Sequence, residues 1–309
     1  MKTMDEAIRE YLFFCTNQRR LDEKTIRAYT NDLLQFRAFC QEGSLMVPRK
    51  TLESYVIGLH QRYKQKTVKR KIASLKAFYN YLEMEEKIDA NPLRRIRMDF
   101  REEKVLPRTI PAVQVERLLT FMYSLQNDKD LTPWQRKNVE RDLAVVELLF
   151  ATGLRISELC HLRPDRVDLE QGILCIRGKG SKERYIQIAN TAVLHQVKKY
   201  RAHWRKEIQA EQFFFLNRYG KRYSEQSARK MIKKYANQAG ICLNITPHMF
   251  RHTFATLLLE EDVDIRYIQK MLGHSSILTT QIYTEVASRK QMEILKTKHP
   301  RNRMRMGGW

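Results

Sequence analysis

The stretch GILCIRGKGSKERYIQI, residues 172–188, sets the fold class that we expect for this chain. Two short runs rich in β-branched residues, 172–176 and 184–188, flank a segment with two glycines. Such a pattern predicts a β-hairpin, with Lys179 at or near its tip. The sequence on both sides of this hairpin has helical character, so we expect a mainly α protein with a small β-sheet (α+β).

Apolar residues that recur every three or four positions mark the helices. In the first hundred residues they recur over Asp22–Cys40, where Asp22 is a possible N-cap, and over Thr67–Met84. Beyond that point the helical signals are 111–122, about 141–150, 224–239 and from His248 onward. The polar residues 124–138 are interpreted as an inserted loop. The charged segment DFREEKVLPR, 99–108, loses this periodicity and predicts a linker between a helical domain, 1–98, and a second domain, 109–309.

The charge of the chain indicates a polyanionic partner. The 309 residues contain 57 Lys and Arg against 35 Asp and Glu, a formal net charge of +22. No run approaches the ~20 apolar residues of a membrane span, and the acidic N-terminal segment does not resemble a signal peptide. We therefore expect no membrane and a cytoplasmic protein.

Metal, redox and nucleotide chemistry are not indicated. The five cysteines are scattered without a CxxC pair, which argues against both a disulfide framework and a zinc knuckle. His248, His252 and His274 have no cysteine or carboxylate at ligand spacing. No phosphate-loop or dinucleotide-binding motif is present. We expect neither a metal nor a cofactor.

A cluster of cations in the helical domain is a candidate DNA-binding surface. The run between positions 64 and 76 carries six cations and no acid. A solvated charged face is the ordinary explanation, but a field of one sign repels itself unless phosphates neutralise it, and we favour DNA contact. The six candidates are Lys64, Lys66, Lys69, Arg70, Lys71 and Lys76.

Several segments of the second domain place side chains suited to phosphate chemistry. In ATGLRISEL, 151–159, Arg155 either caps a helix or pairs with Glu158 three residues on. In HMFRH the spacing of His248 and Arg251 puts an imidazole and a guanidinium on one helical face. Arginine supplies a fork for phosphate oxygens, and histidine transfers protons near neutral pH. His252 is interpreted as a packing residue.

Taken in order, these segments resemble the tyrosine recombinases, or phage integrase family, and most closely its Xer-like members. The resemblance covers nearly the whole chain and rests on six residues in fixed order: Arg155, Lys179 in GKGSKER, His248 and Arg251 in HMFRH, His274 in LGH, and Tyr283 in TTQIYTEV. It implies a helical DNA-clamp domain, a catalytic domain, and a homotetramer acting on two double-stranded DNA recombination sites.

The resemblance also implies the chemistry. Tyr283 would attack a phosphodiester and store its bond energy as a 3′-phosphotyrosine. Arg155 and Arg251 would stabilise the charge of the transition state, with His248 as candidate base. Lys179 would protonate the leaving 5′ oxygen, with Lys182 as a rival.

Two supporting roles come from the resemblance alone. His274 would bind a phosphate oxygen, and Glu158 would orient its neighbours. The expected activity is site-specific recombination, that is, integration, excision, inversion or resolution. The alternatives are a type IB topoisomerase-like activity and a catalytically idle DNA-binding regulator, and the latter disagrees with the presence of all six residues.

The residues after the nucleophile, 285–309, form a basic tail in which Val286, Ile294 and Leu295 are apolar. In Xer-like relatives this segment docks onto a neighbouring protomer. We therefore expect a short helix, ending near Pro300, that anchors one protomer to the next.

Overall fold

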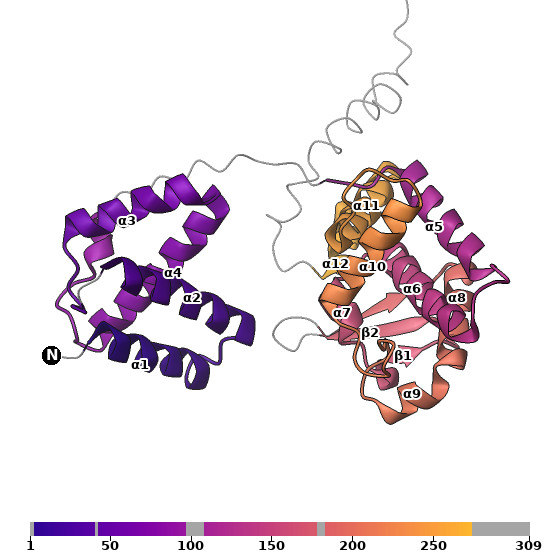
Figure 1. Cartoon of the computed structure of the whole chain (residues 1–309), viewed down its shortest axis with the longest axis horizontal. Helices are drawn as coiled ribbons and strands as arrows, with labels where there is room; N and C mark the ends of the chain where they lie inside the picture. The colour runs from indigo at the N-terminus through magenta and orange to yellow at the C-terminus, as the bar shows by residue number, and fades with distance from the viewer. Residues whose placement is uncertain (1–2, 41–42, 97–107, 178–182, 274–309) are drawn as a thin grey trace, which may run out of the picture. The chain divides into compact units, whose positions relative to one another are not determined.

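The computed structural model divides into two compact units, one within residues 1–105 and one within 106–309. Each unit has its own hydrophobic core. Most of the expected linker, 99–108, lies outside the described part of the chain. The described residues are 3–40, 43–96, 108–177 and 183–273 (Figure 1).

The first unit is helical, as its periodicity predicts. Tyr11, Phe36, Phe78 and Tyr79 are at most 1% exposed and form its aromatic centre, where Phe78 meets both tyrosines edge-on. Its described elements are α1 (Met4–Asn17), α2 (Glu23–Cys40), α3 (Arg49–Arg62), α4 (Gln65–Met84) and the 3-10 helix η1 (Pro92–Arg95).

Local capping sets where the first two helices begin. The Thr3 side chain accepts from the Glu6 backbone, and the Glu6 carboxylate accepts from the Thr3 backbone in return. Asp22, expected as an N-cap, accepts a hydrogen bond of 2.9 Å from the backbone N–H of Thr25. Both contacts satisfy N–H groups that the first turn of a helix leaves without partners.

The second unit combines helices with a small sheet. Its central helix is α6, whose residues 143–146 and 148–149 are fully buried between α5, α8 and α11 (Figure 1). The elements are α5 (Ala112–Gln126), α6 (Pro133–Thr152), α7 (Ile156–Cys160), η2 (Pro164–Arg166), β1 (Val167–Asp168), β2 (Ile173–Arg177), β3 (Glu183–Gln187), α8 (Thr191–His203), α9 (Arg205–Ala210), α10 (Glu225–Gln238), α11 (Pro247–Glu260) and α12 (Ile265–Leu272).

The predicted hairpin is confirmed, and a short third strand extends it. The sheet is antiparallel in the order β1-β2-β3, and Arg177 of β2 pairs with Glu183 of β3 at the end of the ladder. Leu174, Ile176 and Ile186 point into the core while their neighbours along the strands are more accessible, which follows from the two-residue period of a strand.

The expectation of a loop over residues 124–138 is wrong at both ends. Helix α5 continues through Gln126, and α6 begins at Pro133. The reason is local: Thr132 and Gln135 form a capping box, and Pro133 occupies the first turn, where its missing N–H costs nothing. Polar composition concealed this helix start.

Candidate active site

Helix α6 ends at a glycine that sets the position of Arg155. Gly153 has φ of 61°, in the left-handed region, and a Cβ there would lie 2.7 Å from both Leu272 Cδ2 and Phe254 Cδ1. Only glycine combines this backbone conformation with such close neighbours. The turn therefore packs against α11 and α12, and Arg155 follows it as the N-cap of α7.

Arg155 and Glu158 form the pair that their spacing predicts. Arg155 Nη1 donates to Glu158 Oε1 at 2.9 Å, and the Arg155 backbone N–H donates to Oε2 at 2.9 Å. The Glu158 side chain is 8% exposed, whereas that of Arg155 is 36% exposed. The carboxylate is thus a buried support, and the guanidinium remains accessible to a ligand.

A third residue, Arg184 of β3, completes this arrangement, and sequence reasoning missed it. Its Nη1 and Nη2 donate to the two oxygens of Glu158 at 2.9 and 2.8 Å, and its Nε donates to the carbonyl oxygen of Met271 at 3.2 Å. Burial raises the pKa of Glu158, but hydrogen bonds from Arg184 and Arg155 outweigh it and hold the pKa below its ordinary value. Glu158 is therefore ionised at neutral pH.

Arg251 of α11 is 4% exposed and lies against the same turn. Its Nη1 donates to the carbonyl oxygen of Gly153 at 2.9 Å, and its Nη2 donates to that of Leu272 at 2.7 Å. The structure therefore brings Arg155 and Arg251 to one place, although 96 positions separate them in the sequence (251 − 155).

His248 lies one helical turn before Arg251, at the accessible start of α11. Partial burial lowers its pKa below the ordinary value, and the positive charges of Arg251, Arg229 and Arg155 lower it further, against a smaller opposing effect of Glu225. A depressed pKa keeps the imidazole neutral near pH 7, the form that can accept a proton. Arg229 of α10 is a second cation of this site that sequence reasoning missed.

Four of the expected site residues lie outside the described part of the chain. Lys179 and its rival Lys182 belong to the five residues that connect the paired positions Arg177 and Glu183. His274 and Tyr283 follow Gly273, at which the described residues end.

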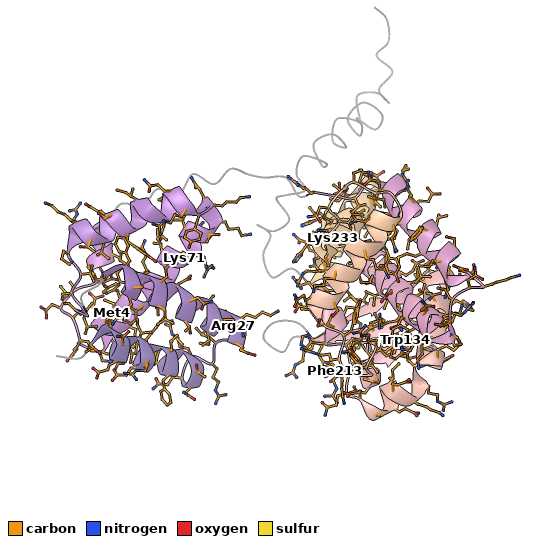
Figure 2. The ribbon with its side chains drawn as sticks, in the orientation of Figure 1. Met4, Arg27, Lys71, Trp134, Phe213 and Lys233 are labelled. Carbon is orange, nitrogen blue, oxygen red and sulfur yellow. The ribbon has the colours of Figure 1, made fainter. Side chains whose placement is uncertain are left out.

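One of the six cations in the cluster of the helical unit is buried. Lys71 is 6% exposed, and its Nζ donates to Asp32 Oδ1 at 2.9 Å inside the unit (Figure 2). Arg70 also pairs with Asp32, which is fully buried, while Lys64, Lys66, Lys69 and Lys76 are exposed. The run itself contains no acidic residue, but Asp32 of α2 supplies one in the folded unit. Lys71 is therefore a buried and paired residue of the helical unit, unlike the other five cations of the run.

Helix α10 carries exposed cations that sequence reasoning did not single out. Lys230, Lys233 and Lys234 are exposed on the face opposite the buried Met231, Ile232 and Tyr235, and Lys233 is labelled in Figure 2. Their paired spacing, RK followed by KK, was the signal available in the sequence. Helix α10 also contacts α7, the helix whose N-cap is Arg155.

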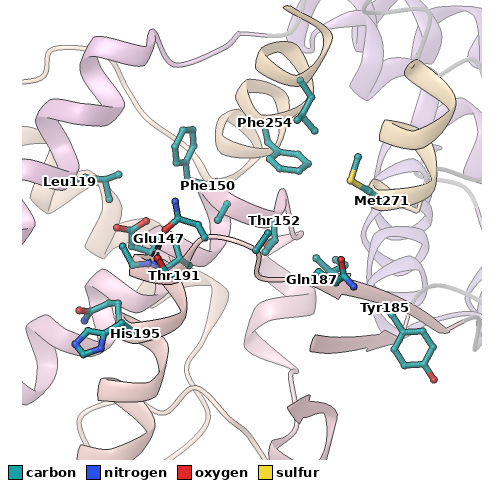
Figure 3. A pocket seen from close by; sticks show the side chains of 18 of the residues that line it. Leu119, Glu147, Phe150, Thr152, Tyr185, Gln187, Thr191, His195, Phe254 and Met271 are labelled. Carbon is teal, nitrogen blue, oxygen red and sulfur yellow. Dashed lines mark hydrogen bonds between the residues drawn. The ribbon is translucent and has the colours of Figure 1, made fainter. Parts of the chain in front are cut away.

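A groove of about 1290 Å³ opens on the second unit. Phe150, Phe254 and Met271 contribute apolar side chains to it from α6, α11 and α12 (Figure 3). Tyr123 donates a hydrogen bond of 2.6 Å to Glu147 at its wall, and burial raises the pKa of Glu147. The groove is mainly apolar and lies near the end of α12.

Metal-binding clusters, membrane-spanning helices and disulfides are absent from the described residues. Within 3–40, 43–96, 108–177 and 183–273, three or more His, Cys, Asp or Glu side chains nowhere gather at metal-binding distance. In the same residues no helix has the length and apolarity to cross a membrane. Each of the five cysteines is a free thiol.

Comparison with known proteins identifies the family of this chain. Residues 108–290 match the model of the phage integrase family, and residues 8–86 match that of the phage integrase N-terminal SAM-like domain. A tyrosine recombinase of Agathobacter rectalis is 52% identical over 97% of this chain and 98% of its own length. The tyrosine recombinase XerD of Listeria monocytogenes serotype 4b is 36% identical over 96% of this chain and all of its own length.

Solved structures show the same fold. The site-specific recombinase XerH, bound to a palindromic difH substrate, superimposes with a TM-score of 0.74 at 22% identity, over 92% of this chain and 82% of XerH. A dimer of lambda integrase residues 75–356 bound to a core site gives a TM-score of 0.67 at 18% identity, over 89% of this chain and 96% of that fragment. The family model over residues 108–290 and the relatives at 52% and 36% identity show that the chain belongs to the phage integrase family and is a tyrosine recombinase, an enzyme of site-specific DNA recombination.

Proposed function

We propose that Tyr283 is the nucleophile of this recombinase. Its phenolic oxygen attacks a phosphodiester and forms a 3′-phosphotyrosine, while the 5′ oxygen leaves with a proton. A 5′ hydroxyl of the second strand then attacks the phosphotyrosine, restores a phosphodiester and returns the proton to the phenol. Each bond broken is matched by one formed, so the energy of the DNA backbone is kept.

The observation that carries the proposal is the convergence of Arg155, Arg251 and His248 at the start of α7 and α11. Arg251 is bonded directly to the turn before Arg155, and both arginines depress the pKa of His248. Two guanidiniums fixed around one point suit the charge that collects on the phosphate oxygens in the transition state. A neutral His248 suits the removal of the proton from the phenol.

The remaining roles rest on the sequence and the family. Lys179 donates the proton to the leaving 5′ oxygen, with Lys182 as its rival on the same loop. His274 binds a phosphate oxygen. The reaction so described requires neither a metal ion nor a cofactor, because cationic side chains neutralise the phosphate.

DNA binding uses both basic units in this proposal. The exposed lysines Lys64, Lys66, Lys69 and Lys76 and the exposed side of Arg70 contact phosphates from the helical unit. The α10 cations do so from the catalytic unit. The net charge of +22 also favours binding to a polyanion such as DNA. Such an enzyme works where bacterial DNA lies, in the cytoplasm at the nucleoid.

Recombination between two duplexes requires four active sites, and we propose a homotetramer. The groove beside α12 supports it, since Phe150, Phe254 and Met271 give it an apolar lining. Residues 274–309 follow α12 directly and include the apolar Val286, Ile294 and Leu295. The tail of one protomer occupies the groove of its neighbour.

The test is a DNA site with a nick close to the scissile phosphate, so that cleavage releases a short fragment and traps the covalent complex. With excess EDTA present throughout, the wild type is expected to form the complex and Tyr283→Phe to form none while binding DNA with similar affinity. Tyr267→Phe is the matched control, because Tyr267 is an exposed tyrosine of α12. An adduct formed by Tyr283→Phe, or a wild type inactive in EDTA, would contradict the proposal.

A further inference from the structure

We propose that Arg184 is a positioning residue for catalysis: it neutralises Glu158, so that the charge of Arg155 stays available to the DNA phosphate. This inference rests on the proposed role of Arg155. Arg184 lies on β3, whereas both partners lie on α7 or at its start. The contact therefore joins the hairpin strand to the helix that carries the catalytic arginine.

The hydrogen bonds of Glu158 show why a second cation is needed. Its two oxygens accept four bonds between 2.8 and 2.9 Å, two from Arg184 and two from Arg155. One of the bonds from Arg155 comes from its backbone, so the Arg155 side chain supplies one of the four. Arg184 supplies both of its terminal nitrogens in a bidentate fork, the stronger arrangement for a carboxylate.

Charge balance gives this geometry a consequence for the reaction. A buried carboxylate strongly attracts any cation within reach, because water no longer screens it. Arg184, whose side chain is 14% exposed, cancels the charge of Glu158 inside the protein. The pair Arg184–Glu158 is then neutral, and Arg155 presents one uncompensated positive charge at the accessible side. Without Arg184, Glu158 would instead neutralise Arg155 and pull its guanidinium inward.

Arg184 also links this support to the end of α12. Its Nε donates to the carbonyl oxygen of Met271, and its stem packs on Gly273 so closely that a Cβ there would lie 3.0 Å from Arg184 Cδ. A guanidinium can make these three directed bonds at once, whereas lysine has one nitrogen. The structure thus separates two contributions of Arg184, its charge and its fork.

The test measures the single-turnover cleavage rate at saturating protein on the nicked site, together with the dissociation constant. Arg184→Gln is expected to slow cleavage on the order of 100-fold, the effect of a small displacement of a catalytic group, with DNA affinity nearly unchanged. Arg184→Lys should recover part of the rate, because it restores the charge without the fork. The control is Arg166→Gln, whose Nη1 donates to Glu183, the neighbour of Arg184, at 2.9 Å.

The double variant Glu158→Gln/Arg184→Gln tests whether the charge of Glu158 causes the loss of rate in Arg184→Gln. Once Glu158 carries no charge, it no longer neutralises Arg155, even when Arg184 is absent. The double variant should therefore cleave faster than Arg184→Gln alone. Tryptophan fluorescence checks folding, because all three tryptophans lie in the catalytic unit. If Arg184→Gln folds and cleaves like the wild type, or if the double variant is no faster, the inference is overturned. If Arg184→Gln does not fold, an Arg184→Lys variant that folds but loses on the order of 100-fold in cleavage rate, although its charge is restored, would overturn it.

These outcomes separate the inference from the proposed function. Arg155→Gln should slow cleavage strongly in every case. If Arg155→Gln cleaves normally, the proposed function itself fails. If Arg155→Gln is slow but Arg184→Gln is not, the proposed function stands and only the role of Arg184 is rejected.

Discussion

Arg251 donates a hydrogen bond of 2.9 Å to the carbonyl oxygen of Gly153, a residue 98 positions earlier in the chain. Gly153 ends α6 two positions before Arg155, so one arginine of the site is fastened to the turn that carries the other. A guanidinium has five N–H groups, and therefore Arg251 can hold the backbone and still donate to a phosphate. The spacing of the two cations is set by this contact.

Gly153→Ala should destabilise the catalytic unit. The new Cβ would lie 2.7 Å from Leu272 Cδ2 and Phe254 Cδ1 on a left-handed backbone. Gly220→Ala is the matched control, since Gly220 has φ of 72° but open space, with Glu207 Cγ at 3.9 Å. Both variants place an alanine in a left-handed backbone conformation, so the difference between their free energies of unfolding measures the overpacking at position 153. We expect this difference to be about 1–3 kcal/mol. Chemical denaturation followed by tryptophan fluorescence measures it, and equal losses would refute the packing role of the glycine.

Burial and nearby cations lower the pKa of His248. As the pH falls, the cleavage rate should therefore stay constant through the ordinary pKa of histidine and drop only at a lower pH. Protonation below that lowered value removes the proposed base and slows the reaction. Arg229→Gln removes a cation, so it should raise the pKa and move the acid limb to higher pH. Glu225→Gln should move it to lower pH. Single-turnover rates against pH test this, and an acid limb that moves in neither variant belongs to another group.

Lys179→Ala should slow cleavage of an ordinary site far more than cleavage of a site with a 5′-thio leaving group. A thiolate departs without protonation, so it does not need a general acid. Lys182→Ala is the matched control on the same loop. The ratio of the two substrate rates is measured for each variant. Equal slowing of both substrates by Lys179→Ala would leave only a phosphate-binding role for this residue.

Lys71→Ala should lower the stability of the helical unit, whereas Lys66→Ala should weaken DNA binding. Lys71 is buried beside Asp32, so its loss should cost about 3 kcal/mol of stability in the helical unit. Lys66 is exposed, and its loss should lower the magnitude of the log–log salt dependence of DNA affinity by about 0.9 with stability unchanged. Hydrogen exchange of residues 4–84 and binding titrations at several salt concentrations measure the two effects. A weaker salt dependence of DNA affinity in Lys71→Ala would indicate that Lys71 contacts DNA.

Truncation after Val286 should leave the binding of one protomer to a half-site intact, because the basic surfaces of both units remain. Cooperative occupancy of a full site and strand exchange should be lost, since the groove beside Met271 would have no tail to hold. Band shifts on one and two half-sites, with a recombination assay, measure this. Full recombination by the truncated protein would reject communication through the tail.

The sequence by itself determined the elements whose signals are local. Periodicity located α2, α4, α5, α10, α11 and the second half of α6, but not α1, α3 or α8. The glycine-containing hairpin was confirmed, and the ordered motifs around Arg155, His248 and Arg251 indicated the family. Local polarity misled over residues 124–138, because a capping box starts a helix inside polar sequence.

Only the tertiary structure decided which charges meet. In the sequence Arg184 is one more cation of a hairpin, and Lys71 is one more cation of a basic run. The structure shows that Arg184 on β3 pairs with Glu158 and that Lys71 pairs with Asp32 of α2. A side chain's ionic partner depends on the packing of elements far apart in the chain, and hydrophobic burial drives that packing without regard to charge pattern. The resemblance could therefore indicate Arg155 as a candidate catalytic arginine, while the fold alone showed that Arg184 shares its partner Glu158.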